Sequence, residues 1–345
     1  MFARRVSVTL FSKKYQNTQL VPHRNVQVSI AGAASDIGSN VALLLKQNMK
    51  VRRLQLYDDD DRVKGIGYEL GNIPGGPLVS VFAGDRKLGP AIRSSEIVLM
   101  VARLPRNPGK TREQMMAANA PNLEELCRAV AEHNQDAFLA ISTNPINSII
   151  PFASSLLYKY NCYNPLKVFG ITHIDSARSR AFAANAINAS ARELNIPVIG
   201  GHSDETIIPL FSNLTPSHLC IDQCLADTLT RLVRKAGTDV VTQKHGHESA
   251  TLAMAWSINE FVDNIIDAVN GSEVVVSSYT ANPNFGTRFF AGPTIVGADG
   301  IIQTCCNLPM NELECYLLNC SIPIINKEIA QGEDFVNYIE SIRKK

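Results

Sequence analysis

Two short segments contain side chains of the types that transfer protons. THIDSARSRAF, residues 172–182, carries Asp175, Arg178 and Arg180, and IGGHSDET, residues 199–206, places His202 after two glycines. A histidine changes its charge near neutral pH, and an acid beside it can orient the ring and stabilise its charged form. With arginines nearby to bind carboxylates, the set predicts an acid/base site for an anionic substrate. His173 is a competitor, because it lies two residues from Asp175.

A glycine-bounded loop, AGAASDIGSN (residues 31–40), lies between a predicted strand and a predicted helix. Gly32 and Gly38 suit a tight turn that brings backbone N–H groups close to a pyrophosphate at a helix N-terminus. Asp58 follows at the end of the next strand, where an acid binds the adenosine ribose and repels a 2′-phosphate, which favours NAD over NADP. The alternative is a structural turn that Ser35 or Asp36 caps.

A third segment, LPRNPGKTREQ (residues 104–114), carries Arg106 and Arg112 on a loop rich in proline and glycine. Paired guanidinium groups suit a carboxylate substrate, although a solvated basic loop has the same composition. The remaining histidines carry no prediction of chemistry. His133 and His218 are expected at the surface, and His245 and His247 lack a third ligand, so no metal site is predicted.

The elements that position these residues follow from short apolar runs separated by helical patterns. Residues 26–31 alternate like a strand and residues 51–58 resume strand character, while the apolar runs without polar alternation are residues 97–102, 137–142 and 167–172. Such strands, buried on both faces by crossover helices, predict an α/β fold with a doubly wound parallel sheet. After about residue 172 the pattern predicts a mixed α+β domain. It has antiparallel strands within residues 273–300 and a closing helix from about Met310 to Gln331.

The composition is that of a globular protein with a small-molecule site. Of the 345 residues, 45% are hydrophobic and 19% are charged, and the net charge of +1 gives no basic field for nucleic acid or a membrane surface. No apolar run reaches the roughly 18 residues that span a bilayer. The eight cysteines are irregularly spaced, which predicts free core thiols in a reducing compartment.

The first 24 residues differ from the rest. They carry Arg4, Arg5, Lys13, Lys14 and Arg24 among hydroxyl residues, and no acid precedes Asp36. This composition predicts a mitochondrial presequence, and hence a location in the mitochondrial matrix. A basic tail with no targeting role is the alternative. We therefore divide the chain into a presequence (1–24), a nucleotide-binding domain (25–170) and a catalytic domain (171–345).

A series of stretches in fixed order is more specific than any single motif. They are IAGAASDIG (30–38), LYD (56–58), PRNPGKTR (105–112), NAPN (119–122), STNPINS (142–148), VFGITHIDSAR (168–178), PVIGGHSDETIIPL (197–210) and SATLAMA (249–255). With these, residues 26–340 resemble the mitochondrial-type malate dehydrogenases of the lactate/malate dehydrogenase family. The resemblance implies a Rossmann-type sheet, an NAD cofactor, malate and oxaloacetate as substrates, and a homodimer.

The resemblance also implies roles for individual residues. His202 would be the acid/base residue and Asp175 its partner, while Arg106, Arg112 and Arg178 hold the substrate carboxylates and Asn144 touches substrate and cofactor. Arg106 would polarise the substrate carbonyl and disfavour lactate. The implied cofactor-binding residues are Gly32, Ala33, Ala34, Ser35, Asp36, Ile37, Gly38, Asp58, Asn119, Ser142, Thr143, Asn144 and Met254.

Some positions depart from the family's pattern. Ser35, Asp36, Arg103 and Glu248 stand where glycines are usual, and Glu205 stands where lysine is usual. A Cβ at position 35 and a negative charge at position 36 predict weaker NAD binding, because both lie where phosphate must approach. A catalytically weakened paralogue with a structural or dimer-forming role is therefore the alternative to an active enzyme.

Overall fold

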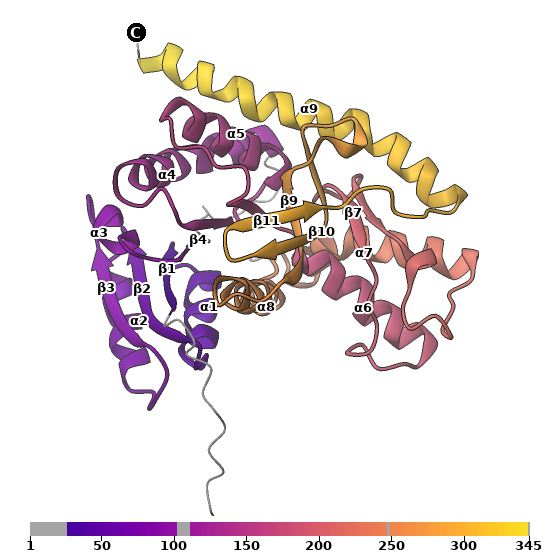
Figure 1. Cartoon of the computed structure of the whole chain (residues 1–345), viewed down its shortest axis with the longest axis horizontal. Coiled ribbons are helices and arrows are strands. Elements are labelled where there is room, and N and C mark those ends of the chain that lie inside the picture. The colour runs from indigo at the N-terminus through magenta and orange to yellow at the C-terminus, as the bar shows by residue number, and fades with distance from the viewer. Residues whose placement is uncertain (1–25, 102–110, 247–248, 344–345) are drawn as a thin grey trace, which may run out of the picture.

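The computed structural model describes residues 26–101, 111–246 and 249–343, and it shows an α/β molecule built on one large sheet (Figure 1). The strands are β1 (Val26–Ala31), β2 (Val51–Asp58), β3 (Leu78–Ala83), β4 (Ile97–Met100), β5 (Phe138–Ile141), β6 (Val168–Ile171), β7 (Val198–Gly200), β8 (Ile207–Pro209), β9 (Val274–Ala281), β10 (Phe289–Gly297) and β11 (Gly300–Thr304).

The helices cover both faces of this sheet and its second half (Figure 1). They are α1 (Asp36–Lys46), α2 (Arg62–Gly71), α3 (Leu88–Ile92), α4 (Arg112–His133), α5 (Ile146–Lys159), α6 (His173–Ile187), α7 (Gln223–Gln243), α8 (Leu252–Val269) and α9 (Glu312–Arg343), with the 3-10 turns η1 (Phe211–Asn213) and η2 (Pro283–Phe285). None of the helices in the described ranges is both long and apolar enough to cross a membrane.

The first half of the chain forms a parallel sheet in the order β3-β2-β1-β4-β5-β6, which confirms the predicted doubly wound fold. The strand order reverses between β1 and β4, and ligands of such sheets bind at the carboxyl ends of the strands beside that reversal. The glycine loop follows β1, Asp58 ends β2, and Ser142 follows β5. The topology therefore brings the predicted cofactor-binding segments to one edge of the sheet.

The helix after the glycine loop forms because its apolar residues recur on one face. Ile37, Val41 and Leu45 of α1 are buried, at the i, i+4 and i+8 positions that face the sheet. Ser35 caps the helix, and Lys46 lies in its last turn. The spacing that predicted this helix is thus the spacing that packs it.

The second half extends the same sheet rather than building a separate one. The predicted antiparallel strands are β9 and β10, which pair along their length, and β9 pairs antiparallel with β6. Gly170 of β6 has no side chain, and a Cβ there would lie 2.8 Å from side-chain carbons of Ile146 and of Ile150. Helix α5 consequently packs directly on β6, where its first turn lies close to the second half of the chain.

The closing helix is longer than the sequence pattern indicated. We expected it to end at about Gln331, but α9 continues to Arg343 and lies along α5 (Figure 1). Gly332 stands inside it, and a Cβ at this position would lie 2.2 Å from the carbonyl oxygen of Ser148 in α5. The glycine therefore serves a close helix–helix contact instead of ending the helix.

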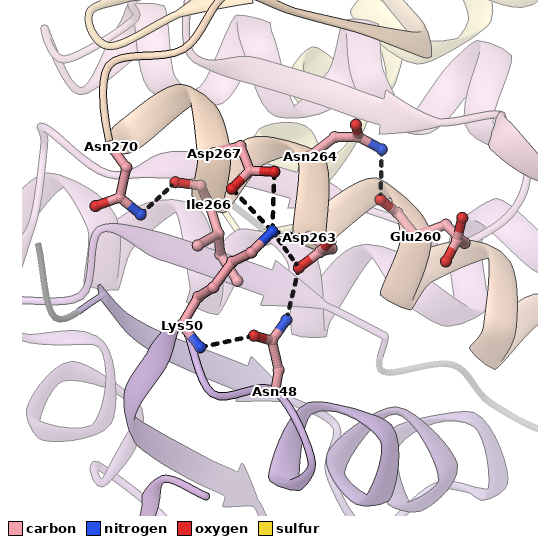
Figure 2. A network of polar contacts seen from close by, with 8 residues as sticks. All are labelled: Asn48, Lys50, Glu260, Asp263, Asn264, Ile266, Asp267 and Asn270. Atoms are coloured by element: carbon pink, nitrogen blue, oxygen red, sulfur yellow. Dashed lines mark hydrogen bonds and ion pairs between the residues drawn. The ribbon is translucent and has the colours of Figure 1, made fainter. Parts of the chain in front are cut away.

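A polar network joins the turn before β2 to α8 (Figure 2). The Lys50 ammonium lies 2.9 Å from Asp267 and 3.2 Å from Asp263, and Asn48 donates to Asp263 at 2.8 Å. Partial burial lowers the pKa of Lys50, but its hydrogen bonds to both carboxylates raise it above the usual value. Because α1 also packs on α8, the network helps to hold α8 against the nucleotide-binding half.

The cysteines are free thiols, but the expectation that they belong to the core was wrong for most of them. Cys127 and Cys305 are buried and Cys162 is partly buried. The exposed cysteines are Cys220, Cys224, Cys306, Cys315 and Cys320. Residue type alone does not bury a small side chain, since its place on an element or loop of the fold decides its exposure.

Candidate functional site

The glycine loop has the geometry of an anion-binding turn. Gly32 adopts φ +92°, which favours glycine, and a Cβ at Gly38 would lie 2.1 Å from the carbonyl oxygen of Gly32. The amides of Asp36 and Ile37 lie in the first turn of α1 and donate no hydrogen bond within the described part of the chain. Free amides at a helix N-terminus are suited to bind phosphate, so the loop fits a dinucleotide.

Ser35 fits the backbone of this turn and caps the helix that follows it. Its φ of −71° is one that any residue adopts, and its hydroxyl donates to Gly32 O at 2.7 Å and accepts from Gly38 N at 3.0 Å. The side chain is thus folded into the loop as the N-cap of α1. The capped turn and the binding turn, which the sequence left as alternatives, are compatible, since the caps leave the amides of Asp36 and Ile37 free. Asp36 itself is exposed.

Asp58 contacts the loop directly from the end of β2. Its Oδ2 accepts from the amide of Ala34 at 2.8 Å and its Oδ1 from the amide of Asp60 at 3.0 Å. Arg62 lies just beyond and forms an ion pair with Asp60 at 2.7 Å. The acid that was selected from its spacing therefore lies against the glycine loop, as a ribose-binding residue requires.

The residues expected on the nicotinamide side come from three elements. Asn119 of α4 donates to the carbonyl of Asn144 at 3.0 Å, and the amide of Ser142 donates to Met100 O at 2.9 Å. Thr143 is buried beside them. Met254 of α8 is buried in the same hydrophobic cluster as the loop residues Ala33, Ala34 and Ile37. The hydrogen bonds tie the segment after β5 to α4 and to the end of β4, and α8 shares one hydrophobic cluster with the cofactor loop.

His202 and Asp175 form a direct pair. The Nδ1 atom of His202 lies 2.6 Å from Oδ2 of Asp175, whose side chain is 1% exposed. A carboxylate only accepts, so Nδ1 carries the proton and Nε2 is left for a ligand. Arg178 lies one turn along α6, with Nη1 3.7 Å from Oδ1 of Asp175. Three residues that are up to 27 positions apart thus meet at one point.

The pairing also decides between the competing histidines. His173, the first residue of α6, contacts neither Asp175 nor any other hydrogen-bond partner in the described ranges through its ring nitrogens. Burial, together with the positive charge of Arg180, lowers the pKa of His173 to about 4, so its ring is neutral at physiological pH. His133 and His218 are exposed, as expected. His202 is therefore the histidine that is placed for acid/base chemistry.

The sequence reasoning missed the residue that holds the backbone of His202. Asn147, in the first turn of α5, accepts from the amide of His202 at 2.8 Å through Oδ1. Its Nδ2 lies 3.3 Å from the hydroxyl of Thr206, which in turn accepts from the amide of Ser203. Asn147 stands within the quoted motif STNPINS, but nothing local to that motif indicates a contact 55 residues away.

Some predicted residues lie outside the part that the structure describes. Arg103 and Arg106 belong to residues 102–110, Glu248 and His247 to residues 247–248, and the side chain of Arg112 is also outside it. Glu205 is described and is exposed, and the neighbouring Asp204 accepts from Thr238 at 3.0 Å. Among the described residues, no three His, Cys, Asp or Glu side chains gather as metal ligands would.

Comparison with known proteins gives two adjoining family matches. The NAD binding domain of lactate/malate dehydrogenases matches residues 26–170, and the α/β C-terminal domain of the same enzymes matches residues 172–336. The chain is 36% identical to the mitochondrial malate dehydrogenase of Sus scrofa over 94% of each chain. It is 35% identical to that of Homo sapiens over 92% of this chain and 93% of the relative. The chain belongs to the lactate/malate dehydrogenase family.

Solved structures of family members have the same fold. The malate dehydrogenase of Cryptosporidium parvum superposes with a TM-score of 0.77 over 90% of this chain and 100% of its own, at 22% identity. The malate dehydrogenase of Picrophilus torridus superposes with a TM-score of 0.76 over 91% of this chain and 99% of its own, at 21% identity. These similarities extend through both halves of the chain, so the α/β sheet and its antiparallel extension are features of the family.

Proposed function

We propose that this member of the family is an NAD-dependent malate dehydrogenase that interconverts malate and oxaloacetate. The observation that carries the proposal is the 2.6 Å contact between His202 and the buried Asp175, with Arg178 beside them. A charge-assisted acid/base pair next to a guanidinium suits a hydroxy acid substrate. The relatives at about 35% identity that are named malate dehydrogenase support the same substrate.

The protein's own residues account for the proton transfer. Asp175 holds the proton of His202 on Nδ1, which leaves Nε2 to accept the proton of the malate C2 hydroxyl. The carboxylate also stabilises the imidazolium that forms. In the reverse direction, protonated Nε2 donates to the oxaloacetate carbonyl. Asn147 fixes the backbone of His202 during both steps. NAD, when bound, supplies the hydride acceptor.

Arginines hold the carboxylates in this proposal. Arg178, 14% exposed, lies beside the pair, and Arg106 and Arg112, the latter the first residue of α4, supply the other guanidinium groups. Arg106 would set specificity, because burying an unpaired guanidinium against the methyl group of lactate costs several kcal/mol, on the order of the charge-desolvation penalty. Asn144 contacts both substrate and cofactor.

The cofactor proposal rests on the loop geometry described above. The free amides of Asp36 and Ile37 bind the pyrophosphate and Asp58 binds the ribose. Asn119, Ser142, Thr143, Asn144 and Met254 line the nicotinamide side. The exposed carboxylate of Asp36 weakens binding without closing the site.

Location, assembly and domain limits are part of the same proposal. The basic residues 1–24 form a mitochondrial presequence, the enzyme works in the matrix, and two copies form a homodimer. The names of the mitochondrial relatives support this location. The division into residues 25–170 and 171–345 follows the change of pattern in the sequence.

The test is oxidation of NADH by the purified protein, with oxaloacetate and with pyruvate as substrates. We expect turnover with oxaloacetate and at least a hundredfold lower kcat/KM with pyruvate, equivalent to about 3 kcal/mol. Turnover with pyruvate alone would contradict the substrate assignment. Absence of turnover at millimolar NADH would favour the weakened paralogue instead, an alternative that no contact in the described site favours.

A further inference from the structure

A buried acid reaches the catalytic segment from the far end of the chain. Glu328 of α9 is 6% exposed, and its Oε2 accepts from Nδ2 of Asn147 at 2.7 Å. The two residues are 181 positions apart. Because a buried carboxylate is stable only where donors satisfy it, this contact is a built feature of the interface between α9 and α5.

Asn147 joins this acid to the backbone of His202. Its Oδ1 accepts from the amide of His202 at 2.8 Å, while its Nδ2 faces Glu328. An asparagine amide has one accepting and one donating end, and a carboxylate accepts but does not donate. Glu328 therefore determines which end of Asn147 points toward His202. If the amide were turned over, its NH₂ group would face the N–H of His202.

The surroundings leave this group little freedom. A Cβ at Gly201 would lie 2.6 Å from Nδ2 of Asn147 and 2.6 Å from the hydroxyl of Thr206, so the backbone passes closely over the amide. Tyr279, fully buried, donates to the carbonyl of Asn147 at 3.5 Å. Burial and the nearby charge of Glu328 raise the pKa of this tyrosine well above its usual value, which keeps it a donor.

We propose that Glu328 is a positioning residue for catalysis, which acts through Asn147 to hold His202 against Asp175. The inference rests on the proposed dehydrogenase function. Without the carboxylate, Nδ2 of Asn147 keeps only its longer 3.3 Å contact with Thr206, and the acceptor that holds the backbone of His202 is less firmly oriented. A displacement of the imidazole on the scale of 1 Å is enough to lower the rate of a proton transfer by about a hundredfold. The cofactor loop makes none of these contacts, so NADH binding should not change.

The first test compares Glu328→Leu, which removes the acceptor, with Glu328→Gln, which keeps one. Turnover of oxaloacetate, the KM for NADH and the melting temperature are measured for each. We expect kcat to fall about tenfold or more in Glu328→Leu with the KM for NADH unchanged. We expect Glu328→Gln to recover most of that loss, because its amide oxygen can still accept from Asn147.

Glu314→Leu is the matched control on the same helix. Glu314 is also buried, at 3% exposed, but it accepts from the amide and hydroxyl of Ser212 and from the amide of Asn311. Its loss should lower the melting temperature as much as the loss of Glu328. The kcat of Glu314→Leu should stay within about twofold of the wild type, because the partners of Glu314 in the described ranges, Ser212 and Asn311, make no hydrogen bond to His202 there.

An exchange of the two groups tests the direction of the hydrogen bond. Asn147→Asp alone sets two carboxylates against each other and should lower kcat about a hundredfold. Combined with Glu328→Gln, the new carboxylate at position 147 accepts from both His202 and the new amide, so kcat should return to the level of Glu328→Gln. The comparison of Asn147→Asp with the double variant keeps the test decisive if Glu328→Leu does not fold.

The outcomes separate the two proposals. A wild-type protein without turnover overturns the dehydrogenase assignment and this inference with it. If the wild type is active and the kcat of Glu328→Leu stays within about threefold of the wild-type value, the inference about Glu328 is overturned and the dehydrogenase assignment stands. An equal loss in Glu314→Leu, or no recovery in the exchange variant, also overturns the inference alone.

Discussion

Replacing Asp175 by asparagine tests the acid/base pair most directly. The substitution keeps the shape of the side chain but removes the charge that lies 2.6 Å from Nδ1 of His202. An amide can also donate to Nδ1, which would hold the imidazole in the tautomer with its proton on Nε2 and unable to accept there. The loss of charge and the reversed tautomer both oppose proton transfer from malate.

The size of the effect follows from the geometry. Both side chains are largely buried, at 1% and 10% exposed, so the pair is little screened by water. With about 4 Å between the centres of charge and an effective dielectric constant of about 20, the attraction between carboxylate and imidazolium is about 4 kcal/mol. Since about 1.4 kcal/mol corresponds to a factor of ten in rate, Asp175→Asn should lower kcat by about a thousandfold.

The assay is the gain of NADH absorbance with saturating malate and NAD, in wild type and variant at equal concentration of folded protein. Asp204→Asn is the control, because Asp204 is an exposed acid two residues from His202 that binds Thr238 instead of the imidazole. Its kcat should stay within about twofold of the wild type. The reasoning is refuted if Asp175→Asn keeps more than a tenth of the activity or if both variants lose activity equally.

Three further predictions concern the cofactor and the stability of the fold. Asp36→Asn should lower the Kd for NADH about two- to fivefold in a fluorescence titration. The substitution removes an exposed negative charge whose repulsion of the phosphates costs about 0.3–1 kcal/mol, and an unchanged Kd would contradict this. Because burial lowers the pKa of His173 to about 4 from 6.5, the unfolded chain binds a proton more readily between these values, and the free energy of unfolding falls as the pH falls through them. Between about pH 7.5 and about pH 5, the free energy of unfolding of His173→Leu, measured in urea, should therefore fall by about 2 kcal/mol less than that of the wild type. Equal falls would refute the lowered pKa of His173. Lys50→Met should lower the free energy of unfolding by up to about 1 kcal/mol, and by less at high salt, with kcat unchanged. The reason is that the side chains of its ion pairs are 33–39% exposed, so water and salt screen them (Figure 2).

Much of the fold could be predicted because its signals are local. The apolar runs of β4, β5 and β6 lack polar alternation, which marks strands that helices cover on both faces, while β1 was predicted from its alternating pattern. The end of α9 could not be predicted in this way. A glycine such as Gly332 is typical of the end of a helix when only its neighbours in sequence are considered. Its close approach to Ser148 depends on α5, a helix far away in the sequence.

The sequence by itself determined which residues could do chemistry. The spacing of Gly32, Gly38 and Asp58, and the acid, arginines and histidine of the second half, follow from residue type and order alone. Ser35 shows the limit of this reasoning. As a non-glycine residue it predicted weaker NAD binding, but residue type alone did not show that its hydroxyl turns inward and holds the loop against α1.

Only the tertiary structure decided which of these groups act together. It selected His202 over His173, although His173 is nearer to Asp175 in sequence, because contact depends on the fold and not on separation along the chain. It also placed Glu328 behind Asn147, across 181 residues. The physical reason is that secondary structure follows from neighbouring side chains, whereas the orientation of a buried polar group is determined by whichever distant donor or acceptor the packed core brings to it.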